Sequence, residues 1–282
     1  MLTDGVTTSR VKVGLWLVAE DRDRPYDGSD PTDNPLQEKT RIRVPLMTVD
    51  VRLTGQFGLQ AAATVPDVTR TAVVTRPGVA LDYRETFHGF GDMSVLAWYR
   101  LRPIRRWNAI VNVGSSLPTG KTEAPRFRSA LDDGSLVPVS RLQRGTGTFD
   151  PLVGLNVDRR FRRISVFGSV ASRLPIAENR HGLRTGASWE TSGGVSRPLG
   201  SHRVVGYGRV GWLHRQQDVF NDTPVLVGGG NWLYITPGVA VQVGKGLQVQ
   251  AEVKLPAYRS LANRQLDSAA IFQFGISRAF GR

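Results

Sequence analysis

The chain has 282 residues, no cysteine, and a net charge of +13 that arises from 37 basic and 24 acidic residues. This length suits one large domain or two small ones, and the absence of cysteine excludes disulfide frameworks, thiolate metal sites and cysteine nucleophiles. Because the basic residues are spread along the chain rather than gathered in one segment, we expect no nucleic-acid partner.

One uncharged stretch, residues 223–244, is long enough to be considered as a transmembrane helix. It contains Pro224, three consecutive glycines and Pro237, which would break a helix at several points. We therefore expect no transmembrane helix. The first residues lack a basic segment followed by an apolar one, so we expect that a secretory leader is absent from this chain.

Apolar residues alternate with polar ones along most of the chain, and this period of two predicts β-strands. In chain order the predicted strands are residues 11–19, 49–53, 59–65, 93–101, 107–113, 153–157, 164–170, 184–196, 204–217, 233–243, 247–255 and 272–276. About twelve strands of about ten residues match the length that crosses a bilayer at a tilt.

Short and long connections alternate between these strands. The short ones lie near residues 55, 103–106, 160–163, 199–202 and 244–246, and the long, polar ones at residues 21–39, 67–91, 118–147, 175–183, 218–230 and 257–266. This alternation predicts a single domain over residues 1–282, an antiparallel up-and-down transmembrane β-barrel with tight turns on one rim and long loops on the other. Both termini then belong to the short-turn rim.

A soluble sandwich or a large lipocalin-like barrel shows the same alternation with its faces reversed. Three features favour the membrane barrel. The apolar residues of the chain are mostly small or β-branched, and those of twelve strands would overfill the interior of a soluble barrel. Aromatic residues stand at strand ends on the short-turn rim, as in an interfacial girdle; these are Phe57, Trp107, Phe161 and Phe280. The third feature is the C-terminal sequence.

The C-terminal stretch IFQFGISRAF places Phe272, Phe274, Ile276 and Phe280 on one parity. It resembles the terminal strand that the outer-membrane assembly machinery recognises. We therefore expect the cell outer membrane as the location, with its lipid and the barrel-assembly machinery as partners. Arg278 falls on the predicted lipid parity, where a side chain near the interface can reach the head groups.

Several glycine-rich stretches resemble an outer-membrane family named for the MetA pathway of phenol degradation, whose members are often described as transporters. They are FGDMSVLAWYRL at residues 90–101, SSLPTGKTE at 115–123, GTGTFDPLVGLNV at 145–157, and RLTGQFGLQAAATVPDV at 52–68. The resemblance implies a monomeric barrel that admits small, often aromatic or apolar compounds. It supplies no catalytic residues.

The sequence offers no pattern typical of an enzyme. The four histidines, His88, His181, His202 and His214, are isolated, and no G-x-S-x-G motif is present. A G-x-G-x-x-G string at residues 206–211 lacks the surrounding βαβ unit and the later acidic residue of a dinucleotide site. We expect no enzyme activity, no cofactor and no metal.

If the apolar parity faces lipid, the other parity faces the lumen and is where selectivity would arise. The candidate lumen residues are Asp92, Trp98, Arg100, Asn112, Asp150, Asn156, Asp158, Arg184, Glu190, Tyr207, Arg209, Glu252 and Lys254. Arg100 or Arg209 set against Asp150, Asp158 or Glu190 could line an eyelet that selects among solutes. Alternatively, these charges pair with one another and plug a narrow barrel.

Further basic residues gather on or beside the predicted short turns: Arg102, Arg105, Arg106, Arg159, Arg160, Arg162, Arg163, Arg197, Arg203 and Lys245. They could anchor the rim against anionic head groups or simply be solvated.

The function expected from the sequence is a channel for passive uptake of small organic solutes, aromatic or apolar ones among them. Two alternatives stay open. One is a soluble ligand-binding β-barrel, and the other is a structural or adhesive barrel whose long loop at residues 118–147 binds a partner.

Overall fold

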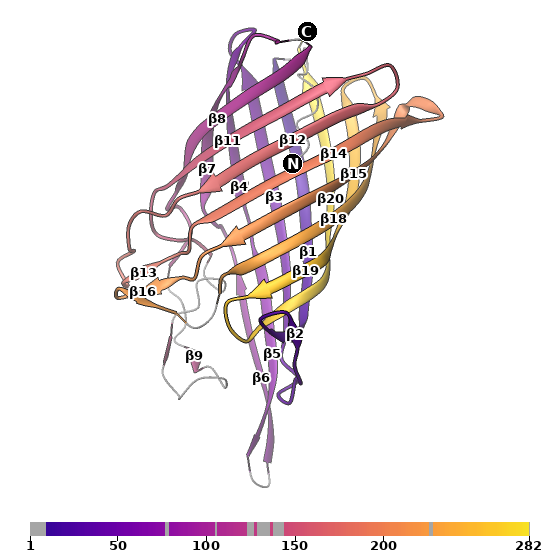
Figure 1. Cartoon of the computed structure of the whole chain (residues 1–282). Coiled ribbons are helices and arrows are strands. Elements are labelled where there is room, and N and C mark those ends of the chain that lie inside the picture. Colours follow the sequence, from indigo (N-terminus) through magenta and orange to yellow (C-terminus); the bar gives the residue numbers. More distant parts are fainter. Residues whose placement is uncertain are drawn as a thin grey trace.

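Among the described residues, twelve antiparallel strands close into a barrel in the computed structural model (Figure 1). The structure describes residues 10–76, 79–104, 106–122, 127–128, 136–137, 144–225 and 228–281. The barrel strands are β1 (Val11–Asp27), β3 (Lys39–Arg52), β4 (Phe57–Thr64), β7 (Met93–Arg100), β8 (Trp107–Leu117), β11 (Asp150–Arg160), β12 (Ser165–Arg173), β14 (Ser188–Leu199), β15 (Ser201–Arg215), β18 (Gly230–Gly244), β19 (Leu247–Leu261) and β20 (Gln265–Phe280).

The first and last strands close the barrel. β1 pairs along its length with both β20 and β3, and Val11 lies opposite Phe280 on one side and Val51 on the other. Every other strand of the wall pairs with its neighbours in chain order. The fold class predicted from the sequence, an all-β up-and-down barrel of about twelve strands, is therefore confirmed.

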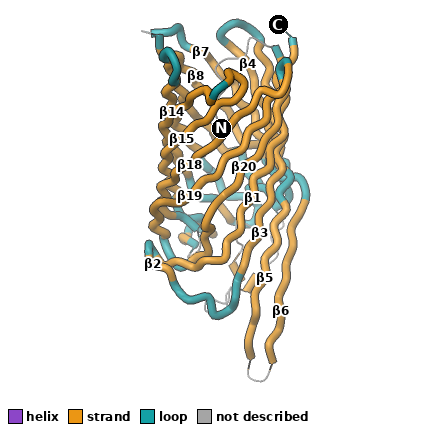
Figure 2. The backbone as a smooth tube through the Cα atoms, turned by 90° about the vertical axis from the view of Figure 1, so that its right-hand side faces the viewer, coloured by secondary structure: helices purple, strands orange, loops and turns teal. Residues whose placement is uncertain are grey.

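The two rims of the barrel differ as predicted. Tight turns at residues 53–56, 101–104 with 106, 161–164, 200 and 245–246 join strands on one rim. β1 begins and β20 ends on that same rim, where the amide of Arg10 donates to the carbonyl of Gly281 at 3.2 Å. The long connections lie at the opposite end (Figure 2). Arg105 and most of the loop at residues 118–147 lie outside the described residues.

Every predicted long connection contains some strand residues, and in three of them the strand segments are long. In the one expected at residues 21–39, β1 continues to Asp27. The region at residues 67–91 forms a hairpin of β5 (Asp67–Arg76) and β6 (Val79–His88), which pairs with β3 and extends past the barrel end (Figure 2). The connection expected at residues 257–266 is only residues 262–264, because β19 continues through Pro256 to Leu261. A register shift beside Pro256 accommodates the missing donor, as bulges do.

The remaining strands are short and lie in the long connections. They are β2 (Asp30–Pro31), β9 (Phe127–Arg128), β10 (Leu136–Val137), β13 (Leu183–Arg184), β16 (Val219–Phe220) and β17 (Thr223–Pro224). In the described part of the chain, no helix has the length and apolar character needed to cross a membrane.

The outer wall of the barrel is apolar and the inner wall is polar. Leu15 is 56% exposed and Phe274 54% exposed, whereas Tyr207 is 7% and Glu252 6% exposed. Other exposed apolar side chains are Met47, Leu59, Val95, Val113, Val153, Leu155, Val170, Val195, Val210, Ile235, Val239, Leu255, Phe272 and Ile276. A soluble barrel needs the reverse arrangement, so this wall is built to contact lipid.

Aromatic side chains mark the short-turn rim. Trp107, Phe161 and Phe280 are exposed there, and the guanidinium of Arg159 lies 5.7 Å from the ring centre of Trp107 and 4.9 Å from that of Phe161. The guanidinium of Arg278 similarly covers Phe280 at 5.1 Å. An interfacial girdle with cationic partners matches the predicted aromatic rim. Recognition of β20 by the assembly machinery stays a prediction.

Candidate functional site: the barrel lumen

Eleven of the thirteen candidate residues lie on the polar parity of barrel strands. They are Trp98 and Arg100 on β7, Asn112 on β8, Asp150, Asn156 and Asp158 on β11, Glu190 on β14, Tyr207 and Arg209 on β15, and Glu252 and Lys254 on β19. The period of two along each strand brings them into one lumen.

The two other candidates do not belong to the wall. Asp92 lies in the connection just before β7 and binds loop residues. Arg184 lies in β13, which pairs with β16 in a small separate sheet. The expected strand at residues 184–196 begins only at Ser188, because the segment before it, held by a bond from the amide of Gly186 to Asp218 at 2.8 Å, belongs to the loop.

The middle of the lumen contains a cavity of about 390 Å³, here called the central cavity. Inward side chains of Trp16, Leu96, Trp98, Ile110 and Leu152 supply apolar surface. Polar lining comes from Lys12, Thr48, Asp50, Arg52, Gln60, Arg100, Asn112, Asn156, Glu190 and Arg209. A space of this size with mixed lining can hold a small organic molecule.

Three inward aromatic side chains lie against glycines on the neighbouring strands. Trp16 faces Gly275, Trp98 faces Gly58 and Tyr207 faces Gly238 in the strand registers. A Cβ atom built on any of these three glycines would collide with the facing ring. The glycines thus let the large rings lie along the wall, which keeps space open in the lumen.

A second and larger cavity, about 1070 Å³, opens toward the short-turn rim and is here called the basic vestibule. Its described lining includes six arginines and a single carboxylate, that of Asp158. The arginines are Arg100, Arg160, Arg162, Arg163, Arg197 and Arg209. Part of the basic charge that the sequence assigned to the rim therefore faces an aqueous space.

Arg100, Asn156, Ser169 and Arg209 line both cavities, so they mark the junction between them. Arg209 donates to Glu252 at 2.9 Å. Glu252 also accepts from the hydroxyl of Tyr207 at 2.9 Å, and that hydroxyl accepts from Gln250 at 2.7 Å. The buried charge of Arg209 is thereby neutralised within a hydrogen-bonded network.

In the described part of the chain, no direct ion pair joins the eyelet arginines to the predicted carboxylates. Electrostatic attraction nevertheless links Arg100 to Asp158 and Arg209 to Glu190. Asp150 pairs with Arg173 at 2.6 Å, Glu190 pairs with Lys254 at 3.3 Å, and Asp158 accepts from Asn108 at 3.0 Å. Arg173 was missed because the predicted strand ended at residue 170, although Arg173 continues the inward parity of Ser169 and Ala171. Many lumen charges are thus paired, and open space lies beside them. A role of these residues in selecting solutes stays a prediction.

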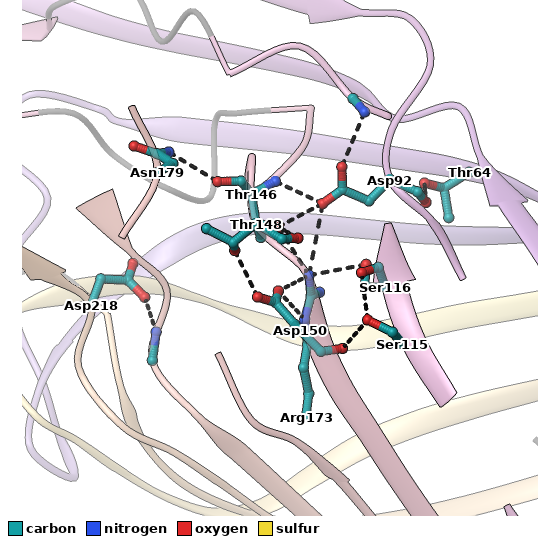
Figure 3. A network of polar contacts seen from close by, with 12 residues as sticks. Thr64, Asp92, Ser115, Ser116, Thr146, Thr148, Asp150, Arg173, Asn179 and Asp218 are labelled. Atoms are coloured by element: carbon teal, nitrogen blue, oxygen red, sulfur yellow. Dashed lines mark hydrogen bonds and ion pairs between the residues drawn. The ribbon is translucent and has the colours of Figure 1, made fainter. Parts of the chain in front are cut away.

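A polar network at the long-loop end joins three of the glycine-rich stretches (Figure 3). Asp92 accepts from the amide of Gly120 at 3.0 Å and from the amide and hydroxyl of Thr146 at 2.7 and 2.8 Å. These residues come from the FGDM, LPTG and GTGTFDP stretches respectively. The resemblance in sequence therefore corresponds to one structural unit that holds two loops against the start of β7.

Arg173 connects this network to the barrel wall. Its guanidinium donates to Asp150, which is 0% exposed, and lies 3.8 Å from Asp92 (Figure 3). Asp150 also accepts from the hydroxyl of Thr148 at 2.7 Å. Asn179, from the connection between β12 and β14, donates to the carbonyl of Thr146 at 2.9 Å. Loops and wall are thus locked together inside the mouth.

An aromatic cluster fills another part of the lumen near the long-loop end. Trp232, Tyr234 and Leu261 are buried there, with Tyr26, Leu213 and Ile271 packed against them. Asp267 accepts from Trp232 Nε1 at 3.0 Å and pairs with Arg259 at 3.3 Å. The basic vestibule thus lies at the short-turn rim and the central cavity in the middle of the lumen, while this cluster occupies part of the lumen near the long loops.

Comparisons with known proteins support the fold. No protein-family model and no curated protein matches the chain. The structure is similar to the COG4313 outer membrane channel from Pseudomonas putida F1, with a TM-score of 0.72 and 10% identity over 98% of this chain and 97% of that chain. It is also similar to the transport unit of the autotransporter AIDA-I from Escherichia coli, with a TM-score of 0.52 and 11% identity over 100% and 93%.

These similarities and the apolar outer wall together identify an outer-membrane β-barrel, located in the bacterial outer membrane. Membership of the family named for the MetA pathway stays a prediction.

Proposed function

We propose that the chain is a passive channel through which small organic solutes, aromatic or apolar ones among them, cross the outer membrane. The observation that carries this proposal is the pair of lumen cavities, of about 390 and 1070 Å³, which share four lining residues inside a lipid-facing barrel. The similarity to a solved structure described as an outer membrane channel supports it. The apolar outer wall argues against the soluble ligand-binding alternative.

The test is conductance. The purified full chain, folded in detergent, is added to a planar lipid bilayer bathed in KCl. We expect discrete current steps, because water-filled space lined by polar side chains conducts ions. The same protein unfolded by heat is the control.

A folded barrel that gives no current steps, and no swelling of liposomes in small sugars, would refute the channel. The structural or adhesive barrel would then be favoured, since a packed cluster occupies part of the lumen near the long loops and the β5–β6 hairpin extends beyond them. Binding of this face to a cell surface or matrix would be the next measurement.

A further inference from the structure

Arg100 is the cation at the junction whose charge is least compensated. Its Nε and Nη2 atoms are buried, yet neither has a hydrogen-bond partner among the described residues. Arg209, at the same junction, is paired with Glu252. A buried guanidinium donor without an acceptor is costly unless a ligand supplies one.

The nearby carboxylates do not fill this role. Asp158 attracts the charge of Arg100 from nearby, but its carboxylate accepts from Asn108. Among the described residues, no hydrogen bond joins it to Nε or Nη2 of Arg100. Glu190 is paired with Lys254, and Asp50 lies opposite Lys12 in the register of β1 and β3. The positive charge at the junction is therefore available to a mobile anion.

The surroundings of Arg100 indicate what kind of anion fits. On one side, the arginines of the basic vestibule create a positive potential that concentrates anions. On the other side, Leu96, Trp98 and Ile110 give the central cavity an apolar surface. The indole N–H of Trp16 in this cavity is also buried without an acceptor among the described residues.

We propose that Arg100 is an anion-binding residue of the lumen and that the solutes are small monocarboxylates with an apolar or aromatic body. The carboxylate would accept two hydrogen bonds from the planar guanidinium in bidentate geometry. The body of the solute would lie along the apolar side of the central cavity. This inference rests on the proposed channel function and narrows its substrate class.

Block of the ionic current by a carboxylate distinguishes anion binding at Arg100 from unselective permeability of the channel. Sodium benzoate is titrated into a bilayer that contains the conducting protein, and the KCl current is compared with that in benzamide, a neutral molecule of nearly the same shape. We expect anion-selective reversal potentials and saturable block by benzoate only. Arg100→Gln should weaken the benzoate block by at least about tenfold, the effect of losing one charge-assisted hydrogen bond.

Two variants control the test. Arg102→Gln removes the same charge from an exposed turn residue that lines neither cavity and should leave block unchanged. Arg100→Lys keeps the charge and should retain anion selectivity while losing part of the benzoate affinity. Equal block by benzoate and benzamide, or equal behaviour of Arg100→Gln and Arg102→Gln, would overturn the proposal.

A binding measurement separates this inference from the channel itself. Benzoate bound in the central cavity should quench tryptophan fluorescence, because Trp16 and Trp98 line that cavity. The quenching is measured in detergent micelles and requires no conduction. Saturable quenching that Arg100→Gln abolishes, in a protein without current steps, would uphold the site and refute the channel. Current steps without Arg100-dependent quenching would refute the site alone.

Discussion

At the scale of single residues, glycines determine how much of the lumen stays open. Trp16, Trp98 and Tyr207 are large side chains on the inward parity, and each would project into the lumen if its cross-strand neighbour had a Cβ atom. A glycine in a strand interior usually weakens the strand. Here the loss is offset by aromatic surface packed against the bare backbone.

Gly275→Ala tests this role. The new methyl group would collide with the indole of Trp16, so the ring must rotate into the central cavity. We expect a smaller single-channel conductance with an intact barrel. Gly208→Ala is the matched control, since no atom lies within 4 Å of a Cβ built there. Identical conductance in both variants would show that Trp16 does not limit the pore.

The sequence allowed the facing of lumen residues to be predicted but not their partners. The period of two placed Glu190, Arg209 and Glu252 on the inner wall without knowledge of the barrel. Arg209 reaches Glu252 across the intervening strand β18, however, and this pairing depends on strand stagger and tilt. Alternation contains no information on stagger, so the pairing could not be derived from it.

At the scale of elements, the polar network around Asp92, Asp150 and Arg173 fixes the long connections to the wall. It joins the starts of β7 and β11 and the end of β12 to loop residues Gly120, Thr146 and Asn179. The glycine-rich stretches are recognisable in the sequence. That they contact one another becomes evident only when the strands between them are closed into a barrel.

Arg173→Ala should destabilise this mouth. Asp150 would remain buried with its carboxylate facing no cation, a change that costs about 3–5 kcal/mol. We expect the variant to unfold at a lower urea concentration in micelles, as monitored by tryptophan fluorescence. We also expect noisier single-channel currents, because the loops are no longer held to the wall. The double variant Arg173→Ala with Asp150→Ala removes both charges and should lose less stability. A double variant less stable than the single one would contradict this account.

The predicted strands were more reliable than the predicted loops. Within the bilayer one face must be apolar, so alternation is enforced and the twelve wall strands were recognisable. Beyond the bilayer this constraint ends, and the β5–β6 hairpin was missed. The strand predicted at residues 247–255 was too short, because a register shift beside Pro256 lets β19 continue to Leu261.

At the scale of the whole molecule, the polarity of the wall is the reverse of that in a soluble barrel. Leu155 and Asn156 are adjacent on β11, but Leu155 is 39% exposed on the outer wall while Asn156 lines both cavities. Adjacent residues of one strand therefore face lipid on one side and the aqueous lumen on the other.

Substituting these two neighbours tests the polarity. Leu155→Arg places a charge against hydrocarbon and should cost about 2–4 kcal/mol near the midplane. Asn156→Arg places the same charge in the lumen, where it should leave stability nearly unchanged and increase anion selectivity. Reversible folding into lipid vesicles in urea gives both free energies. Equal destabilisation by the two substitutions would argue against the assigned faces.

The basic vestibule also gives the pore an electrical direction. Its arginines gather at the short-turn end, while the charges near the long loops, such as Asp150 and Arg173, are paired. Counter-anions therefore accumulate at one mouth, and a voltage of one sign drives them inward while the opposite sign depletes them. The barrel is expected to act as an ionic rectifier, passing unequal currents at opposite voltages, with the inequality fading near 1 M salt as the screening length falls to about 3 Å.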